Sequence, residues 1–349
     1  MHPFNQLPLP PNPLVDAQGQ LTFGQFRGSV PQVLGDHRAD YRTPLGAPAS
    51  AFARHFHYKQ FQYFGIIGDD LLAGCAFAHT RYLGIAFFYI FRPSTGDLQE
   101  YTFRSPLGRA LSLSDSPRHG ESRFEQGKVS LCMQYREHPD GSLEKTLAVQ
   151  LPGVALDARM VEAPAYEPMS LCTRIGINGW VYANKVAGVR VDGTLRTGAG
   201  EASLAAHNAF GHHDFSSGYM RRETFWNWAC MSGEAGGMRL GLNLSCGVNE
   251  TSFTENCLWL DDELIKVSTT VFDYDRDNLL NDWHIETGDG AVSLHFQPLG
   301  RHVERLNLGL FASNFNQLFG RFQGHVRRPD GTQLAVELYG FVEEQYAKW

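Results

Sequence analysis

The chain has 349 residues, 43% of them hydrophobic, with a formal net charge of −7 and an isoelectric point near 6.0. This length suits two domains or one large all-β body. The acidic balance, without any run of lysines and arginines, excludes a general attraction to nucleic acid or anionic membranes, so we expect neither as a partner.

The first 50 residues are rich in proline and glycine, beginning with Pro3 and Pro8 and ending with Pro44 and Pro48. Proline blocks regular helices and central strands. We therefore predict an extended N-terminal arm over residues 1–50 that wraps the body rather than folding alone.

The N-terminus, the apolar stretches and the cysteines bear on the expected location of the protein. The segment after Met1 has no basic region followed by an apolar region, so it does not predict a signal peptide. No stretch approaches the ~20 uninterrupted apolar residues of a membrane helix. Six scattered cysteines, with no Cys-x-x-Cys pair, are typical of free thiols in a reducing compartment. We therefore expect a cytoplasmic protein.

From about residue 52 onward, short runs rich in Phe, Tyr, Val, Leu and Ile alternate with turn residues such as Asp140-Gly141. Each run has the length and composition of a strand. The first series of predicted strands covers residues 55–67, 71–78, 82–92, 98–104, 128–137 and 143–150.

A second series follows a break marked by Pro152, Pro164 and Pro168. One short helix is predicted at residues 201–208. Two series of similar strand number favour an all-β fold, with antiparallel β-barrels packed side by side over residues 51–165 and 166–349. A barrel of about eight strands holds one small ligand in its interior or mouth. The predicted strands of the second series cover residues 175–182, 186–195, 238–244, 253–260, 264–273, 291–297, 306–312, 320–326 and 333–342.

Residues 212–228 (HHDFSSGYMRRETFWNW) concentrate titratable, cationic and aromatic side chains without a clean structural period. A carboxyl group in an apolar pocket has a raised pKa and can donate a proton near pH 7, and histidine titrates near neutrality. The catalytic candidates are Asp214, Glu255 and His213. The substrate-binding candidates are Tyr219, Arg222, Trp226, Trp228, Asn256 and Glu304.

A purely structural interpretation of the same residues stays open. Trp226 and Trp228 could point to one face of a strand as core or barrel-wall residues, with the neighbouring arginines solvated. Glu255 could close a turn, and Glu304 could form surface ion pairs.

No metal or other cofactor is predicted. The adjacent His212 and His213 would point to opposite faces of a strand, and no familiar zinc spacing includes them. Residues 273–277 resemble the opening of a calcium loop, but Asn278 stands where glycine is needed and His284 where a bidentate glutamate is needed. Gly-x-Ser-x-Gly and Gly-x-Gly-x-x-Gly motifs are absent.

Six short pieces of sequence carry a family resemblance. Through them the chain resembles a bacterial domain family of unassigned function, itself similar to the carotenoid hydratase (hydroxyneurosporene synthase) and AttH-like group. The resemblance implies two lipocalin-like β-barrels and a pocket lined by Asp214, Trp226, Trp228 and Asn256. The pieces are residues 214–218 (DFSSG), 222–229 (RETFWNWA), 241–244 (GLNL), 255–256 (EN), 319–324 (FGRFQG) and 340–343 (GFVE).

These observations favour a cofactor-independent enzyme, a hydro-lyase or an isomerase, acting on an apolar small molecule in a β-barrel pocket. Asp214 would be the general acid for hydration, dehydration or isomerisation. Tyr219 and the two tryptophans would stabilise positive charge, and Glu255 or Asn256 would position water. Two alternatives remain: a lipocalin-like carrier of a hydrophobic ligand, and a glycoside hydrolase with paired carboxylates.

Overall fold

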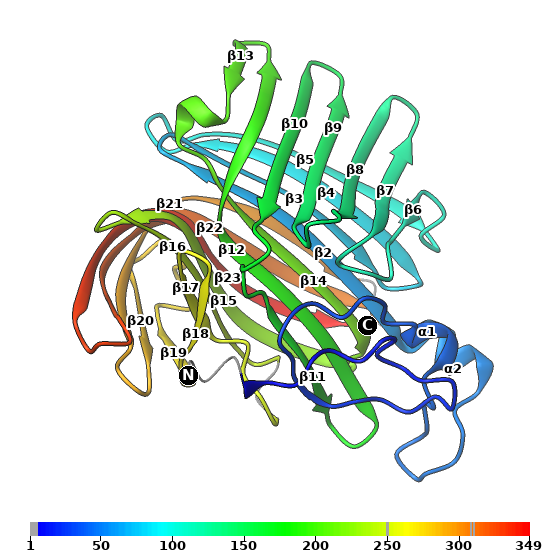
Figure 1. The fold of residues 1–349 in the computed structure, drawn as a ribbon. Helices are drawn as coiled ribbons and strands as arrows, with labels where there is room; N and C mark the ends of the chain where they lie inside the picture. Colours follow the sequence, from blue (N-terminus) through cyan, green and yellow to red (C-terminus); the bar gives the residue numbers. More distant parts are fainter. Residues whose placement is uncertain (1–5, 249–250, 308, 310) are drawn as a thin grey trace.

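The structure, a computed structural model, describes residues 6–248, 251–307, 309 and 311–349. Strands dominate it (Figure 1), which confirms the predicted all-β class. Helical segments include α1 (Gly35–Arg38), α2 (Ala51–His57) and a 3-10 turn at Ala205–His207. The predicted helix over residues 201–208 is wrong, because strand β13 (Gly200–Ser203) pairs with a neighbouring strand before that 3-10 turn.

Fourteen strands of the described chain form the first sheet. Their main order is β5-β4-β3-β2-β14-β12-β10-β9-β8-β7-β6, with β11 and β13 pairing β12, and β1 pairing β11. The sheet curls into a nearly closed barrel (Figure 1). Its strands are β1 (Gly24–Gln25), β2 (Tyr58–Gly68), β3 (Leu71–His79), β4 (Leu83–Arg92), β5 (Asp97–Pro106), β6 (Leu111–Ser112), β7 (Gly120–Gln126), β8 (Val129–Glu137), β9 (Leu143–Leu151), β10 (Val154–Glu162), β11 (Met169–Ile175), β12 (Gly179–Thr197), β13 and β14 (Phe210–Tyr219).

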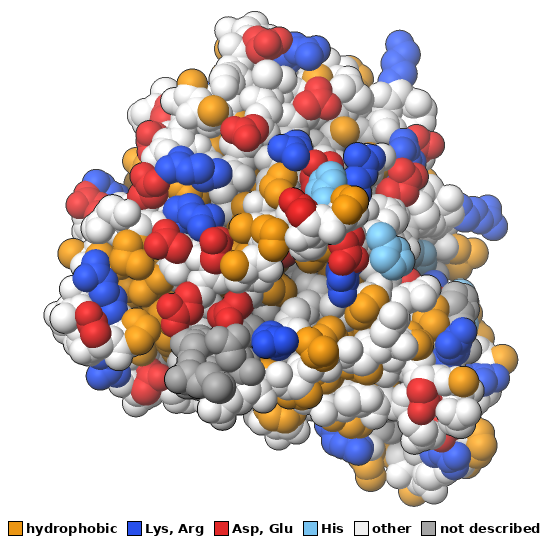
Figure 2. Space-filling model, viewed as in Figure 1, with side chains coloured by type: hydrophobic (Ala, Val, Ile, Leu, Met, Phe, Trp, Pro, Cys, Tyr) orange, Lys and Arg blue, Asp and Glu red, His pale blue; other side chains and the backbone are white. Residues whose placement is uncertain are grey.

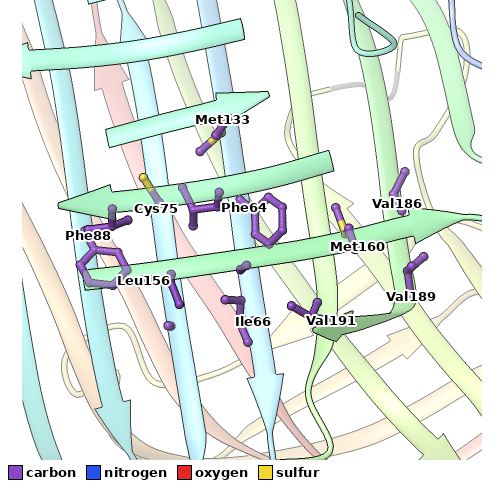
Figure 3. Packing of buried hydrophobic residues seen from close by; sticks show 14 of the residues in the cluster. Phe64, Ile66, Cys75, Phe88, Met133, Leu156, Met160, Val186, Val189 and Val191 are labelled. Atoms are coloured by element: carbon purple, nitrogen blue, oxygen red, sulfur yellow. The ribbon is translucent and has the colours of Figure 1, made fainter. Parts of the chain in front are cut away.

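Apolar side chains from both walls fill this barrel. Figure 3 shows Phe64 and Phe88 on one wall and Met133 and Leu156 on the other, all within one buried cluster. Strand β10 alternates between buried and more exposed residues, as a strand does when only one of its faces packs on a core. The interior of the first barrel is therefore a packed core.

Nine strands of the described residues form the second sheet, in the order β18-β17-β16-β15-β23-β22-β21-β20-β19. It curves into a half-barrel around its own core, which includes Trp283 and Phe322. Its strands are β15 (Glu223–Ala235), β16 (Met238–Cys246), β17 (Cys257–Leu260), β18 (Glu263–Lys266), β19 (Thr270–Asp273), β20 (Trp283–Thr287), β21 (Val292–Asn307), β22 (Ala312–Arg327) and β23 (Gln333–Lys348).

The two sheets pack against each other through aromatic side chains. Strands β2, β3 and β4 are buried along most of their length, because one face meets the barrel core and the other meets the second sheet. This double burial explains why the sequences of β3 and β4 are almost continuously apolar. The interface cluster contains Tyr63, Ile67, Leu72, Ala76, Phe87, Tyr89, Phe91, Trp228, Cys230, Phe315, Phe319 and Phe341.

A backbone contact between two glycines brings the sheets together at a second place. Gly188 has a φ of +73°, and a β-carbon there would lie 2.9 Å from the backbone nitrogen of Gly241. Only glycine suits both the left-handed backbone and this spacing. Strand β12 of the first sheet therefore lies directly against β16 of the second.

The described part of the N-terminal arm packs on the body as predicted; residues 1–5 lie outside the described residues. Val15, Phe26 and Val30 are buried together with Tyr182 and Phe215 of the first sheet. Strand β1 also pairs with β11. Burial of these apolar side chains holds the proline-rich segment against the barrel, although its regular structure is limited to β1 and α1.

The change from one sheet to the other comes between Tyr219 and Glu223. Strands β11, β12 and β14 thus pair within the first sheet, although they follow the proline-marked break. The division into domains 51–165 and 166–349 stays a prediction, since strand pairing alone does not delimit folding units.

Figure 2 shows acidic and basic side chains interspersed over the face that it presents, a mixture that gives a weak long-range field there. None of the helices in the described ranges is long and apolar enough to cross a membrane.

Candidate active site

A cavity of about 390 Å³ lies between the two sheets. Strands β2, β3, β4, β12 and β14 line one side, and β15, β16 and β21 to β23 line the other. The sequence placed a ligand in the interior or mouth of a barrel; side chains fill the interior of the first barrel, and the cavity lies where the two sheets meet. The apolar and aromatic lining residues include Phe61, Tyr63, Tyr82, Ile85, Phe87, Val181, Trp226, Trp228, Phe311 and Phe315.

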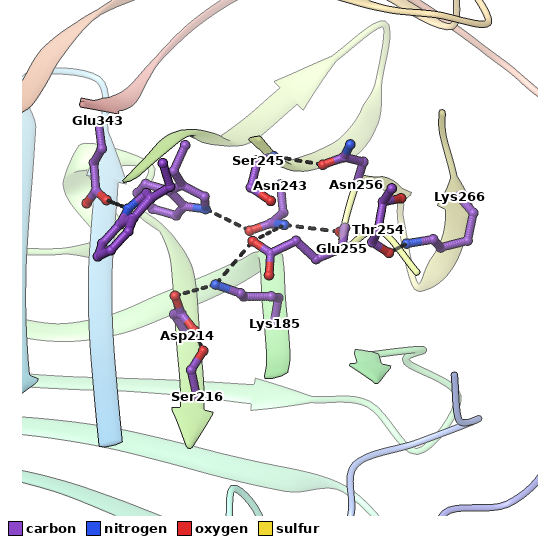
Figure 4. Close-up of polar contacts among 12 residues, drawn as sticks. Lys185, Asp214, Ser216, Asn243, Ser245, Thr254, Glu255, Asn256, Lys266 and Glu343 are labelled. Atoms are coloured by element: carbon purple, nitrogen blue, oxygen red, sulfur yellow. Dashed lines mark hydrogen bonds and ion pairs between the residues drawn. The ribbon is translucent and has the colours of Figure 1, made fainter. Parts of the chain in front are cut away.

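One wall of the cavity holds a buried lysine between two carboxylates (Figure 4). Lys185 on β12 and Asp214 on β14 are register partners, and the Nζ of Lys185 donates to Oδ2 of Asp214. The same Nζ lies 3.5 Å from Oε1 of Glu255. All three side chains are buried and line the cavity.

Burial would lower the pKa of Lys185, but the negative charges of Asp214 and Glu255 outweigh it and raise this pKa above its usual value. Lys185 is therefore an ammonium at neutral pH. Burial and the nearby Glu255 raise the pKa of Asp214, and Lys185 opposes that shift. Direct contact with the ammonium favours the ionised form of Asp214.

A third buried carboxyl group, Glu343 on β23, lines the opposite side of the cavity. Its Oε2 accepts a hydrogen bond from Nε1 of Trp226 at 3.2 Å, and its Oε1 accepts one from Nε2 of Gln317 at 2.6 Å. Burial, the largest cause, raises the pKa of Glu343 to about 7 against the opposing effect of these two donors.

The charge balance of the cavity supports a proton on Glu343. Three ionised carboxylates around Lys185 would leave two uncompensated negative charges in a buried site, which is costly. Asp214 and Glu255 share the ammonium, whereas no described lysine or arginine contacts Glu343. Glu343 is therefore the group that takes up a proton near neutral pH.

This protonation makes stability depend on pH. The ordinary pKa of 4.5 applies to Glu343 in the unfolded chain, and its folded-state pKa is about 7. Between these values the folded state holds a proton that the unfolded state has lost. The proton on Glu343 contributes fully to the free energy of unfolding below pH 4.5, and this contribution is lost as pH rises through 7. Between these two pH values the free energy of unfolding falls by about 1.4 kcal/mol per pH unit.

Urea unfolding of wild type and Glu343→Gln at pH 5 and pH 7.5 measures this contribution. The variant cannot ionise at this position, so its stability relative to wild type should rise between the two pH values. An equal difference between the proteins at both pH values would contradict the assignment.

The two tryptophans are fixed by hydrogen bonds at the cavity wall. Nε1 of Trp228 donates to Oδ1 of Asn243 at 2.9 Å, and the edge of its ring meets His212 with the centroids 5.0 Å apart. Trp226 is held by Glu343. Aromatic faces so placed beside an acid can stabilise a developing cation.

The structure brings five of the nine predicted site residues to the cavity: Asp214, Glu255, Trp226, Trp228 and Glu304. Glu304 is the least available of them for chemistry, because Thr102 and Arg104 both donate to its carboxylate.

The other four predicted residues do not line the cavity. His213 points to the opposite face of β14, into the first barrel, where Nε2 lies 3.2 Å from the hydroxyl of Tyr135. Tyr219 stacks on Tyr41 of the N-terminal arm. Strand alternation and the arm thus direct both side chains away from the site.

Arg222 donates to the backbone carbonyl of Trp349. Asn256 holds the segment that carries Glu255: its Oδ1 accepts from the amide of Ser245 at 2.7 Å (Figure 4), and its Nδ2 donates to the carbonyl of Ser268 at 3.0 Å. Asn256 is therefore placed to position Glu255 rather than to touch a ligand.

Sequence analysis missed Lys185 and Glu343 as site residues. Lys185 lies in the apolar run 180–191 (WVYANKVAGVRV), and a lysine inside such a run is rarely buried without a charged partner. Glu343 ends one of the pieces behind the family resemblance. Both signals were present, but neither one indicated that these residues meet Asp214.

Within the described ranges, no group of three or more His, Cys, Asp and Glu side chains is arranged to hold a metal ion. That the protein works without a metal or other cofactor stays a prediction.

Comparison with known proteins gives a family and a fold. A family model for a domain of unknown function (DUF2804) matches residues 8–349, and no curated protein matches the sequence. The crystal structure of CghA with Sch210972 is 12% identical, with a TM-score of 0.56, over 96% of this chain and 97% of CghA. This likeness shows the fold alone and confirms the predicted pair of lipocalin-like barrels.

Two further solved structures are similar at lower scores. A putative AttH from Nitrosomonas europaea is 13% identical, with a TM-score of 0.49, over 82% of this chain and 92% of that one. Kievitone hydratase from Nectria haematococca is 10% identical, with a TM-score of 0.47, over 98% of each chain.

Proposed function

Because the chain belongs to DUF2804, a family of domains of unknown function, we propose its function from the cavity itself. It is a cofactor-independent enzyme that acts on an apolar small molecule by acid-catalysed hydration, dehydration or isomerisation. The observation that carries this function is Glu343, a buried carboxyl group with a pKa of about 7, in an otherwise largely apolar cavity.

In the hydration direction, Glu343 gives its proton to one carbon of a C=C bond, and the neighbouring carbon becomes positive. Trp226 and Trp228 present aromatic rings to this charge, and the carboxylates of Asp214 and Glu255 add negative potential. Water bonds to the positive carbon and returns a proton to Glu343, so the double bond is replaced by one C–H and one C–O bond.

Dehydration is the reverse sequence. In isomerisation the cation loses a different proton to Glu343, and no water is added. This assignment moves the role of general acid from Asp214, as expected from sequence, to Glu343. Asp214 supports the reaction as the ionised partner of Lys185.

The apolar walls also suit a carrier that binds a hydrophobic ligand without changing it. They suit a sugar less well, and Glu304, one of the carboxylates that line the cavity, is held by Arg104. The carrier is therefore the alternative to test against the enzyme.

Incubation of the dialysed protein with a lipid extract of its source cells, followed by mass spectrometry, separates the two functions. We expect one apolar compound to decrease while a product with the mass of one water more or less, or with equal mass, increases. Heat-denatured protein is the control. A compound that is bound but recovered unchanged would support the carrier and contradict the enzyme.

A further inference from the structure

A second buried lysine, Lys59 on β2, lines the cavity far from the Lys185 group. Tyr63 is the register partner of Asp214, and Lys59 pairs with Gly218 on the same two strands. Four residues of strand separate Lys59 from the Asp214 position, which corresponds to about 13 Å. An even number of residues also places Lys59 and Tyr63 on the same face of the strand.

Lys59 differs from the other cavity cations in its partners. Each of these others contacts a carboxylate: Lys185 that of Asp214, Arg104 that of Glu304, and Lys348 that of Glu223 at 3.5 Å. In the described part of the chain, no carboxylate contacts Lys59. Its Nζ donates to the carbonyls of Phe56 at 2.5 Å and Thr80 at 2.9 Å.

An ammonium has three N–H donors, and among the described residues these two carbonyls are its acceptors, so one donor of Lys59 remains. The side chain is 4% exposed, and its Nζ lies 5.3 Å from the ring centroid of Tyr82, another cavity residue. A buried ammonium without an anion is unfavourable. A ligand anion in the cavity would supply the missing charge and the third hydrogen bond.

Arg81 and Arg222 add positive charge near Lys59, although Arg81 also forms an ion pair with Asp36 at 2.9 Å. Burial, then the charges of Arg81 and Arg222, lower the pKa of Lys59 to about 7. Burial, then Arg81, His55 and Lys59, lower the pKa of His79 to about 4. An arriving anion would offset this field and favour the charged form of Lys59.

We propose that Lys59 binds the carboxylate of an amphipathic acid whose apolar chain extends through the cavity toward Glu343 and Asp214. The substrate class is thus an apolar carboxylic acid whose chain is long enough to span the cavity from Lys59 to the position of Asp214, about 13 Å along the strand. The reaction part of this inference rests on the proposed function, whereas the binding of a carboxylate by Lys59 does not depend on it. One remaining N–H suits a carboxylate oxygen better than a phosphate, which offers three oxygens.

Isothermal titration calorimetry with laurate and dodecan-1-ol tests the proposal, because these probes share a chain length and differ in charge. Wild type should bind laurate about 10-fold to 100-fold more tightly than dodecan-1-ol, as expected for a hydrogen bond to a charged group. Lys59→Met should remove this preference without weakening dodecan-1-ol binding. Lys348→Met, which removes a cavity cation that already has a carboxylate partner, is the matched control and should keep the preference.

The comparison of the two probes on wild type stands even if a variant does not fold. Laurate binding no tighter than dodecan-1-ol, or an unchanged preference in Lys59→Met, would overturn the role of Lys59 and leave the proposed function intact. Binding of neither probe would also overturn the proposal for Lys59, because the cavity would then accept no chain of this kind; the proposed function is tested separately by turnover of the cell extract.

Discussion

Replacement of Glu343 by glutamine is expected to lower turnover of the cavity's substrate by about 10²-fold to 10⁴-fold, the usual contribution of a general acid. Glutamine keeps the shape of the side chain but has no acidic proton. Binding should change little, since the apolar walls stay the same. The measurement is the rate of loss of the compound identified from the cell extract, together with its affinity for each protein.

Glu344 offers a matched control on the same strand. It is also buried, but its side chain points to the other face of β23, where Oε2 accepts a hydrogen bond from Tyr274 at 2.7 Å. Glu344→Gln should therefore retain turnover. Equal rates for wild type and Glu343→Gln would remove Glu343 from the mechanism.

Replacement of Lys185 by methionine should destabilise the fold by about 3–5 kcal/mol. Methionine fills a similar volume but leaves Asp214 and Glu255 buried without their shared cation. Urea unfolding at neutral pH measures the loss. The half-exposed ion pair of Arg190 and Glu234 provides a control, because Arg190→Met should cost about 1 kcal/mol or less.

A double variant tests the cause of that loss. Lys185→Met with Asp214→Asn removes one of the two buried negative charges that the loss of Lys185 leaves unpaired. The double variant should therefore be more stable than Lys185→Met alone. If the double variant were less stable than the single one by the full effect of Asp214→Asn, the loss would come from packing and not from unpaired charge.

Much of the fold could be predicted because strand patterns are local. The nearly continuous apolar runs of β3 and β4 follow from the burial of both faces, whereas β10, β14 and β15 lie in segments for which no strand was predicted. The short helix over 201–208 failed because pairing of β13 with β12 outweighs local helix preference. The position of the cavity between the two sheets could not be predicted for a similar reason, since the sequence does not show which faces of the two barrels meet.

The sequence identified four residues of the candidate site, because they are polar or aromatic residues in an unusual sequence context: Asp214, Glu255, Trp226 and Trp228. His213 could not be separated from Asp214 in the same way, because only the direction of the strand decides which of two neighbours faces the cavity. Lys185 and Glu343 carried local signals, but nothing in the sequence near either residue indicated that it meets Asp214.

The sequence by itself determined many of the strands and turns, the extended arm and the presence of carboxylates among aromatics, since these depend on residues close together in the chain. Only the tertiary structure decided where the acid lies. Lys185, Asp214, Glu255 and Glu343 come from separate parts of the chain, and burial at the contact between the two sheets gives them a common charge balance. The pKa of Glu343 is a property of that shared environment, which no single segment contains.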